Sequence, residues 1–213
     1  MDAGTVRIAV APAGGRSWID ASEVEAKIPQ LHFLRFYDAA APGDPNTLEP
    51  SIWGIPSLLN AAVPSSALQQ LDAAYIARAE TALMSVPHEW RLEEDDPDGS
   101  RRKAVRNLLT VITEPDGIAQ AIATKVLHKK RPLLIPIVDS VIAGFYDVDR
   151  PTDLIFDPFR DDLLRNRAIL AHLASVVTAA AGLEVSSLRA LELSIWLTSA
   201  QAGDAYRVEL HRD

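Results

Sequence analysis

The segment from Gly117 to Tyr146 constrains the fold more than any other part of this chain. Its first residues have the hydrophobic spacing of a helix, which ends in a basic run before Pro132. Proline disfavours helical geometry in the residue that precedes it, so the helix must end there. The apolar run Leu133–Val138 has to be buried, and Asp139 then opens another helix. The sequence thus predicts a helix, a basic turn and a buried approach to a carboxylate.

Helical spacing of apolar residues also extends over most of the remaining chain. Further helical segments are predicted near residues 20–36, 51–61, 65–84, 100–113, 160–181 and 186–200. Alternation over Thr5–Val10 and Ala205–Leu210 predicts a short strand at each end, and the two strands could pair. We therefore expect a mainly α, compact single helical domain over residues 1–213, with a motif region at residues 114–146.

The composition excludes several classes of protein and site. The chain has no cysteine, which rules out disulfides, thiolate catalysis and cysteine-ligated zinc or iron–sulfur sites. Its five histidines lack the spacing of metal ligands, so we expect neither a metal nor a cofactor. No apolar run reaches the roughly 18–20 residues of a membrane span. The first residues lack a secretory signal, so a cytoplasmic protein is expected.

Basic residues gather in one stretch although the net charge is -8. Eight cationic residues lie between residues 101 and 131 against two acidic ones, and they are Arg101, Arg102, Lys103, Arg106, Lys125, Lys129, Lys130 and Arg131. This asymmetry indicates either a phosphate-facing side on an acidic protein or two solvated helix faces that happen to be basic.

Asp139 has two interpretations. An aspartate directly before a helix is an ordinary N-cap that contributes about 1 kcal/mol. At the end of an apolar run it can also be a poised carboxylate, which stabilises a developing cation or orients a water molecule. In the turn before the preceding helix, Asp116 is the expected N-cap. Gly117 is expected at positive φ, followed by amides that are free to bind an anion.

These residues resemble the core motif of the helix-hairpin-helix DNA glycosylase superfamily. Gly117-Ile118-Ala119 stands at the hairpin, Ile122-Ala123 at the family's Thr-Ala position, and Pro136–Asp139 at the segment with the catalytic aspartate. The sixteen-residue interval from Ala123 to Asp139 is similar to the family's usual spacing. The string from Lys130 to Val141 also resembles an uncharacterised actinobacterial family related to that superfamily.

The resemblance implies an N-glycosidic hydrolase that acts on a base in double-stranded DNA. Asp139 would be the catalytic carboxylate, and Gly117 and Ile118 would face a phosphate. Other expected contacts are a basic DNA groove and a stacking aromatic residue: Lys125, Lys129, Lys130 and Arg131 for the groove, and Trp53 or Tyr146 for stacking.

Several positions depart from the family's pattern. Ala119 replaces the second hairpin glycine, and Asp116 would repel a phosphate. No lysine stands shortly before Gly117, where bifunctional relatives carry their Schiff-base nucleophile. The resemblance therefore implies a monofunctional enzyme without lyase activity and without an iron–sulfur cluster.

Two alternatives use the same residues differently. One is a non-catalytic descendant of the glycosylase fold that binds nucleic acid or a partner protein, with Asp139 only a helix cap. The other is a structural or regulatory protein with no nucleic-acid role, which the acidic balance outside the basic stretch favours. An Asp139 that lines an open pocket supports chemistry, whereas one that is sealed under side chains supports the cap alone.

Overall fold

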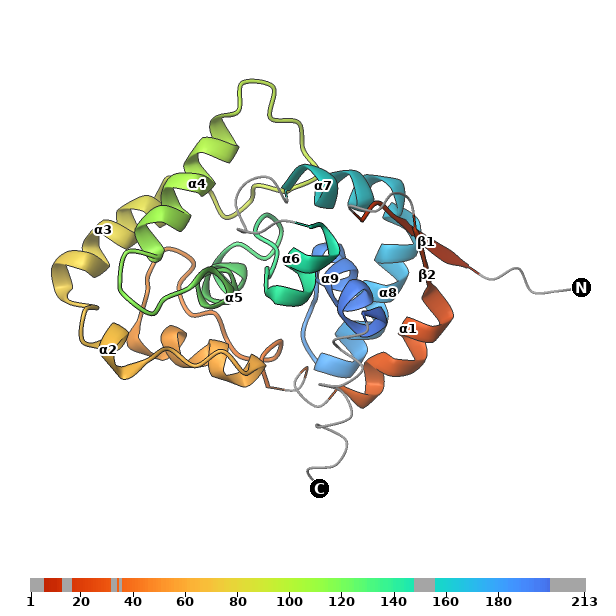
Figure 1. The fold of residues 1–213 in the computed structure, drawn as a ribbon, viewed down its shortest axis with the longest axis horizontal. Helices are drawn as coiled ribbons and strands as arrows, with labels where there is room; N and C mark the ends of the chain where they lie inside the picture. The colour runs from red at the N-terminus through yellow and green to blue at the C-terminus, as the bar shows by residue number, and fades with distance from the viewer. Residues whose placement is uncertain (1–5, 13–16, 32–33, 35, 148–155, 200–213) are drawn as a thin grey trace, which may run out of the picture.

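Helices make up most of the chain, as the periodicity predicts (Figure 1). The computed structural model describes residues 6–12, 17–31, 34, 36–147 and 156–199. Its α-helices are α1 Ala21–Lys27, α2 Ser65–Leu68, α3 Ala73–Met84, α4 Ser100–Ile112, α5 Gln120–Lys130, α6 Ser140–Phe145, α7 Phe156–Arg165, α8 Arg167–Ala181 and α9 Ser187–Thr198. Two further segments are 3-10 helices, η1 Ile28–Gln30 and η3 Pro50–Leu59. The expected mainly α fold class is confirmed.

The predicted strand at the N-terminal end is present, with a partner that the periodicity did not indicate. Strand β1 (Arg7–Val10) pairs antiparallel with β2 (Ser17–Asp20). The amide and carbonyl of Ala9 are both bound by the side chain of Asn166, at 2.8 and 2.6 Å, which ties the ribbon to the start of α8. The strand predicted at residues 205–210 lies outside the described residues.

Local side-chain chemistry divides or reshapes three of the predicted helices. The helix expected over residues 65–84 is two helices, because Asp72 accepts a hydrogen bond from the amide of Tyr75 at 2.7 Å and starts α3 anew. The segment 51–61 is the 3-10 helix η3, which contains Pro56 and ends at Asn60 with φ 55°. The helix expected over residues 160–181 breaks at Asn166 between α7 and α8.

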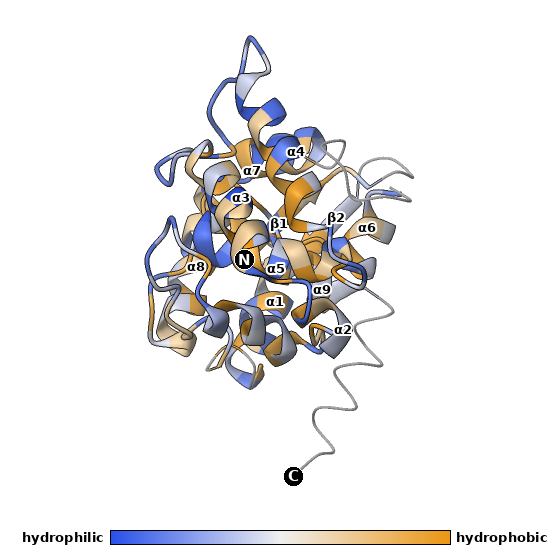
Figure 2. Ribbon diagram, turned by 90° about the vertical axis from the view of Figure 1, so that its left-hand side faces the viewer, coloured by the Kyte–Doolittle hydropathy of each residue, from blue (hydrophilic) through white to orange (hydrophobic). Residues whose placement is uncertain are grey.

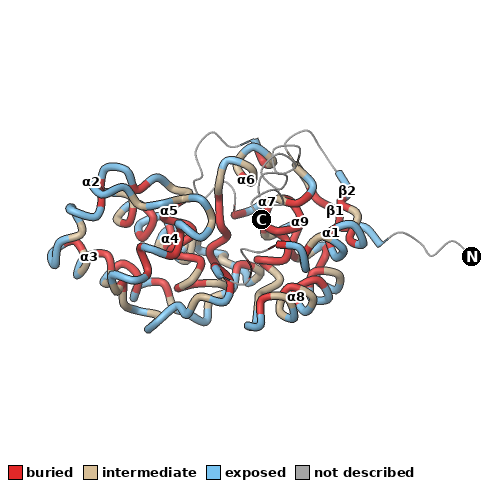
Figure 3. The backbone as a smooth tube through the Cα atoms, turned by 90° about the horizontal axis from the view of Figure 1, so that it is seen from below, coloured by how far each residue is buried: buried red, intermediate tan, exposed pale blue. Residues whose placement is uncertain are grey.

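The elements form two halves around one apolar interior (Figures 1 and 3). Helices α3, α4 and α5 and segment η3 pack together in one half, and α9 packs with α1, α6, α7 and α8 in the other. The hydrophobic stretches of the ribbon gather inside (Figure 2), and buried side chains of both halves belong to one cluster. The chain crosses from α5 to α6 through residues 131–139, so this segment lies at the junction of the halves.

Candidate functional site

The turn between α4 and α5 has the expected backbone at Gly117 but not the expected cap. Gly117 adopts φ +95°, and it is exposed. The N-cap of α5 is Ala119, without a side-chain bond, so the prediction of Asp116 as the cap is wrong. The amide of Asp116 donates to Oε1 of Gln70 at 3.1 Å, which holds the turn against the end of α2. This contact fixes Asp116 outside the helix.

Ile118 is the other turn residue that was expected to face a phosphate. Its side chain is buried, and its amide donates to the carbonyl of Pro115 at 3.0 Å. The amide is therefore engaged within the turn. Phosphate binding by Gly117 and Ile118 stays a prediction.

The basic run at the end of α5 binds a loop of the same chain. We call Lys129, Lys130 and Arg131 the basic clamp. The Lys129 ammonium donates to the carbonyls of Tyr37 and Asp38, each at 3.1 Å. The Lys130 ammonium donates to the carbonyl of Asp44 at 2.8 Å and also to that of Pro42. These bonds hold the loop over residues 37–44 against α5.

Arg131 is the most enclosed member of the basic clamp, with no exposed surface. Its guanidinium donates to the carbonyls of Pro45 at 2.6 Å and Leu83 at 2.7 Å, to that of Val86, and to Oδ1 of Asn46 at 3.0 Å. Burial lowers the pKa of Arg131 to about 10. The expected DNA groove gains no support from this position, and DNA contacts by the basic clamp stay a prediction.

Lys125 lies one turn earlier on α5 and is also buried. Its ammonium donates to the carbonyl of Leu59 at 3.1 Å. Burial lowers the pKa of Lys125, and the nearby charge of Asp139 opposes that shift. The structure therefore brings together two of the residues that the sequence singled out.

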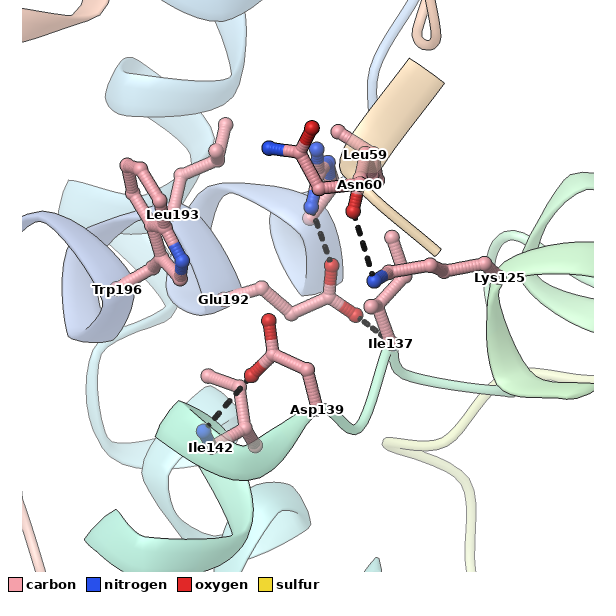
Figure 4. A pocket seen from close by; sticks show the side chains of 10 residues that line it. Leu59, Asn60, Lys125, Ile137, Asp139, Ile142, Glu192, Leu193 and Trp196 are labelled. Atoms are coloured by element: carbon pink, nitrogen blue, oxygen red, sulfur yellow. Dashed lines mark hydrogen bonds and ion pairs between the residues drawn. The ribbon is translucent and has the colours of Figure 1, made fainter. Parts of the chain in front are cut away.

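A small cavity of about 60 Å³ lies where η3, α5, α6 and α9 meet (Figure 4). This volume has room for a few water molecules. Its polar lining is Asn60, Lys125, Asp139, Arg189 and Glu192, and its apolar lining is Leu59, Ile137, Ile142, Leu193 and Trp196. The residues that line the cavity come from the end of η3, from α5, from α6 and the segment before it, and from α9, the last described helix. Because these segments are separate in the sequence, only the folded chain brings the residues together.

Asp139 caps α6 and lines this cavity. Its Oδ1 accepts hydrogen bonds from the amides of Val141 at 3.0 Å and Ile142 at 3.1 Å, so the N-cap interpretation is confirmed. The residue is half-buried, not sealed. Within the described part of the chain, no hydrogen bond occupies its second oxygen. The Asp139 side chain projects toward Glu192 of α9 (Figure 4).

The far wall of the cavity contains a buried cluster of charges. The Arg189 guanidinium donates to both carboxylate oxygens of Asp38, at 2.9 and 3.1 Å, and to Oε2 of Glu192 at 3.1 Å. Oε1 of Glu192 accepts the amide of Ile137. Nδ1 of His128 lies 2.8 Å from the carbonyl of Ile135 and 3.7 Å from Oε1 of Glu192. One guanidinium thus serves two buried carboxylates.

Burial has the largest effect on the pKa values of Glu192 and His128 in this cluster. Burial raises the pKa of Glu192 to about 8, although the charge of Arg189 works against that shift. Burial lowers the pKa of His128 to about 4. Burial alone would also lower the pKa of Arg189, but its two carboxylate partners outweigh this effect and keep it charged.

Several residues of the site were missed from the sequence. Arg189 and Glu192 lie three residues apart in a helix that is otherwise mostly apolar, and two charges within an apolar helix are the signal that was available. Trp196 lines the cavity, whereas the expected stacking residues lie elsewhere. Trp53 is buried against Tyr75, and the hydroxyl of Tyr146 donates to Asp162 at 3.0 Å.

The fold and site define a mainly α protein with a carboxylate-containing cavity between its two halves. The chain belongs to the family described as a family of unknown function (DUF6308), which matches residues 28–199. This range includes every residue that lines the cavity. No curated protein and no solved structure matches the chain. Among the described residues, no helix is long and apolar enough to cross a membrane, and no group of side chains is arranged to hold a metal ion.

Proposed function

We propose that this protein is a monofunctional N-glycosidic hydrolase of the helix-hairpin-helix glycosylase type, which releases a base from DNA. The position of Asp139 supports this proposal best. One of its oxygens caps α6, the other has no hydrogen-bond partner among the described residues, and both Asp139 and Lys125 line the cavity. A carboxylate fixed in this way can orient a water molecule and stabilise the positive charge that develops on the sugar.

The size of the cavity indicates which of the reactants would lie inside it and which would lie outside. About 60 Å³ accommodates the attacking water but not a base. The sugar and base would therefore lie at the mouth of the cavity. The exposed Asn60, which lines the cavity, offers an amide that can both donate hydrogen bonds to a base and accept them.

The proposal that the substrate is duplex DNA rests on the resemblance of the motif region, residues 114–146, to the helix-hairpin-helix glycosylases. Because the basic clamp is engaged with its own loop, phosphate contacts would fall to exposed groups nearby. These are the turn at Gly117 and the side chain of Lys103 on α4, which packs against α5. A cytoplasmic location is part of the same proposal, and cell fractionation tests it.

Base release from duplex oligonucleotides that each carry one modified base tests the proposed function. We expect the wild type to release at least one base, and Asp139→Asn to lower that rate by about 100-fold or more. The matched control is Asp72→Asn, since Asp72 caps α3 in the same manner away from the cavity. Unchanged release by Asp139→Asn, or no release by the wild type from any duplex, would contradict the proposal.

A second candidate is the non-catalytic descendant, favoured by the structural use of the basic clamp and of the Asp139 cap. It predicts no base release but salt-dependent DNA binding. Charge reversal at the exposed Lys103 should then weaken binding. Reversal within the basic clamp is unsuitable for this purpose, because it would disrupt the fold. If the protein neither binds DNA nor releases a base, a structural role is the interpretation that remains.

A further inference from the structure

Glu192 is a carboxyl group of the cavity that the role proposed for Asp139 does not use. It belongs to α9, and it lines the cavity together with Asp139, while its own carboxyl group is directed toward Ile137 and Arg189 (Figure 4). Only 2% of its surface is exposed, so the cavity is its route to a substrate. The two carboxyl groups differ in their surroundings. Asp139 is held by helix amides, whereas Glu192 lies within the buried charge cluster.

Burial of Glu192 favours a bound proton, against the opposing effect of Arg189 and of the amide of Ile137. The titratable and charged groups that face it come from every neighbouring element, and they are Arg189 on its own helix, Tyr37 and Asp38 in the loop, Lys125 and His128 on α5, and Asp139 before α6. The Arg189 guanidinium divides its donors between Asp38 and Glu192. Burial of Glu192 outweighs the contacts that favour its charged form, so its pKa is about 8 and the carboxyl group holds a proton near neutral pH.

We propose that Glu192 is the acid that protonates the leaving base, and that the substrates of this cavity are bases that carry no charge before cleavage. This inference rests on the proposed function. A neutral base leaves as an anion unless it receives a proton, so its release benefits from an acid. A ring-alkylated, cationic base leaves as a neutral molecule and needs none. An acid built into the wall of the cavity therefore indicates the first class of substrate.

The step balances with water as the only co-reactant. The bond between the sugar carbon and the base nitrogen breaks, and its electron pair stays with the base. The base takes the proton of Glu192 by way of a water molecule in the cavity, which gives one proton to the base and receives the one from Glu192. The oxygen of the attacking water bonds to the sugar carbon, and a proton of that water moves to Asp139. Transfer of that proton through the cavity back to Glu192 restores both groups.

Two duplex substrates separate this inference from the proposed function. One carries a neutral base, such as uracil or hypoxanthine, and the other carries the cationic 7-methylguanine. We expect the wild type to release the neutral base, and Glu192→Gln to lower that release by about 100-fold or more. Any release of the cationic base should change less than threefold in Glu192→Gln, whereas Asp139→Asn should impair both. Glu184→Gln, an exposed carboxyl group outside the cavity, is the control.

Each other outcome is decisive. If Glu192→Gln still releases the neutral base at the wild-type rate, or if the wild type releases only the cationic base, the acid role is overturned while the function of Asp139 stands. If the wild type releases neither of these bases nor any other base from the set of duplexes, both proposals are overturned. Circular dichroism verifies that Glu192→Gln is folded, which we expect because a glutamine oxygen can still accept the amide of Ile137.

A measurement on the wild type tests the acid without any substrate. Infrared spectra of protein labelled with ¹³C at glutamate carboxyl groups should show a protonated carboxyl band that persists to about pH 8. The band should be absent from Glu192→Gln and present in Glu184→Gln. A spectrum in which every glutamate is ionised at pH 6.5 would overturn the proposal, whatever the activity measurements show.

Discussion

At the scale of single residues, Asp139 combines two roles that substitutions can separate. Asparagine caps helices about as well as aspartate, whereas alanine does not. We therefore expect Asp139→Ala to lower the free energy of unfolding by about 1 kcal/mol and Asp139→Asn to lower it by much less. Urea denaturation at pH 7 measures both. Equal losses would mean that the charge of Asp139, not its capping bonds to Val141 and Ile142, stabilises α6.

The protonation of Glu192 predicts how stability depends on pH. Its pKa is about 8 in the folded protein and about 4.5 in the unfolded chain, so the folded state binds the proton more tightly. The stabilisation is complete below pH 4.5 and is lost as the pH rises through 8. His128 has the opposite shift, from 6.5 to about 4, so its contribution is lost only as the pH falls below 6.5.

Of these two groups, only Glu192 therefore changes its contribution to stability between pH 6.5 and 8. We expect the free energy of unfolding of the wild type to fall over this range, and we expect this contribution to the slope to be absent from Glu192→Gln. Urea titrations at closely spaced pH values measure the slope. An identical slope in the variant would show that Glu192 is already ionised at pH 6.5.

At the scale of elements, the turn between α4 and α5 depends on a glycine. Gly117 has φ +95°, and a Cβ there would lie 3.0 Å from Cγ of Pro64. We expect Gly117→Ala to cost about 1–3 kcal/mol, since both backbone strain and this contact oppose it. The control is Gly182→Ala at the end of α8, where φ is +74° but nothing lies within 4 Å. Urea denaturation should show a smaller loss for the control.

The basic clamp is the second feature to consider at the scale of elements. Arg131→Met would remove the guanidinium donor from the carbonyls of Pro45, Leu83 and Val86, of which Leu83 alone keeps another donor among the described residues, the amide of Val86. We expect a loss of about 3 kcal/mol or more, because unpaired buried polar groups keep their full desolvation cost. Lys103→Met, on the exposed face of α4, should change stability by less than about 0.5 kcal/mol. Equal effects in thermal unfolding would mean that Arg131 is solvated in solution.

At the scale of the whole molecule, the two halves share one buried cluster, and the Arg189–Asp38 ion pair lies at their junction. We therefore expect residues 1–213 to unfold as a single domain. Urea transitions followed by far-ultraviolet circular dichroism and by tryptophan fluorescence should coincide. Trp53 reports on one half and Trp196 on the other. Two separated transitions would show that the halves fold independently.

Features that depend on neighbouring residues were predictable. The end of α5 before Pro132, the positive φ of Gly117 and the capping of α6 by Asp139 follow from the chemistry of one or two adjacent residues. Helix breaks that need a particular side-chain hydrogen bond were not predictable. Examples are the new N-cap at Asp72 and the interruption at Asn166. Such bonds compete closely with continued helix, and packing decides the outcome.

The sequence by itself determined the mainly helical class and the position of Asp139 at the start of α6, because backbone preferences and caps act over a few residues. Only the tertiary structure decided what the charges do. It bound the basic clamp to carbonyls of the same chain, and it brought Asp38 to Arg189 across 151 residues. The energy of a charge depends on the partners that surround it after folding, and those partners come from distant parts of the chain.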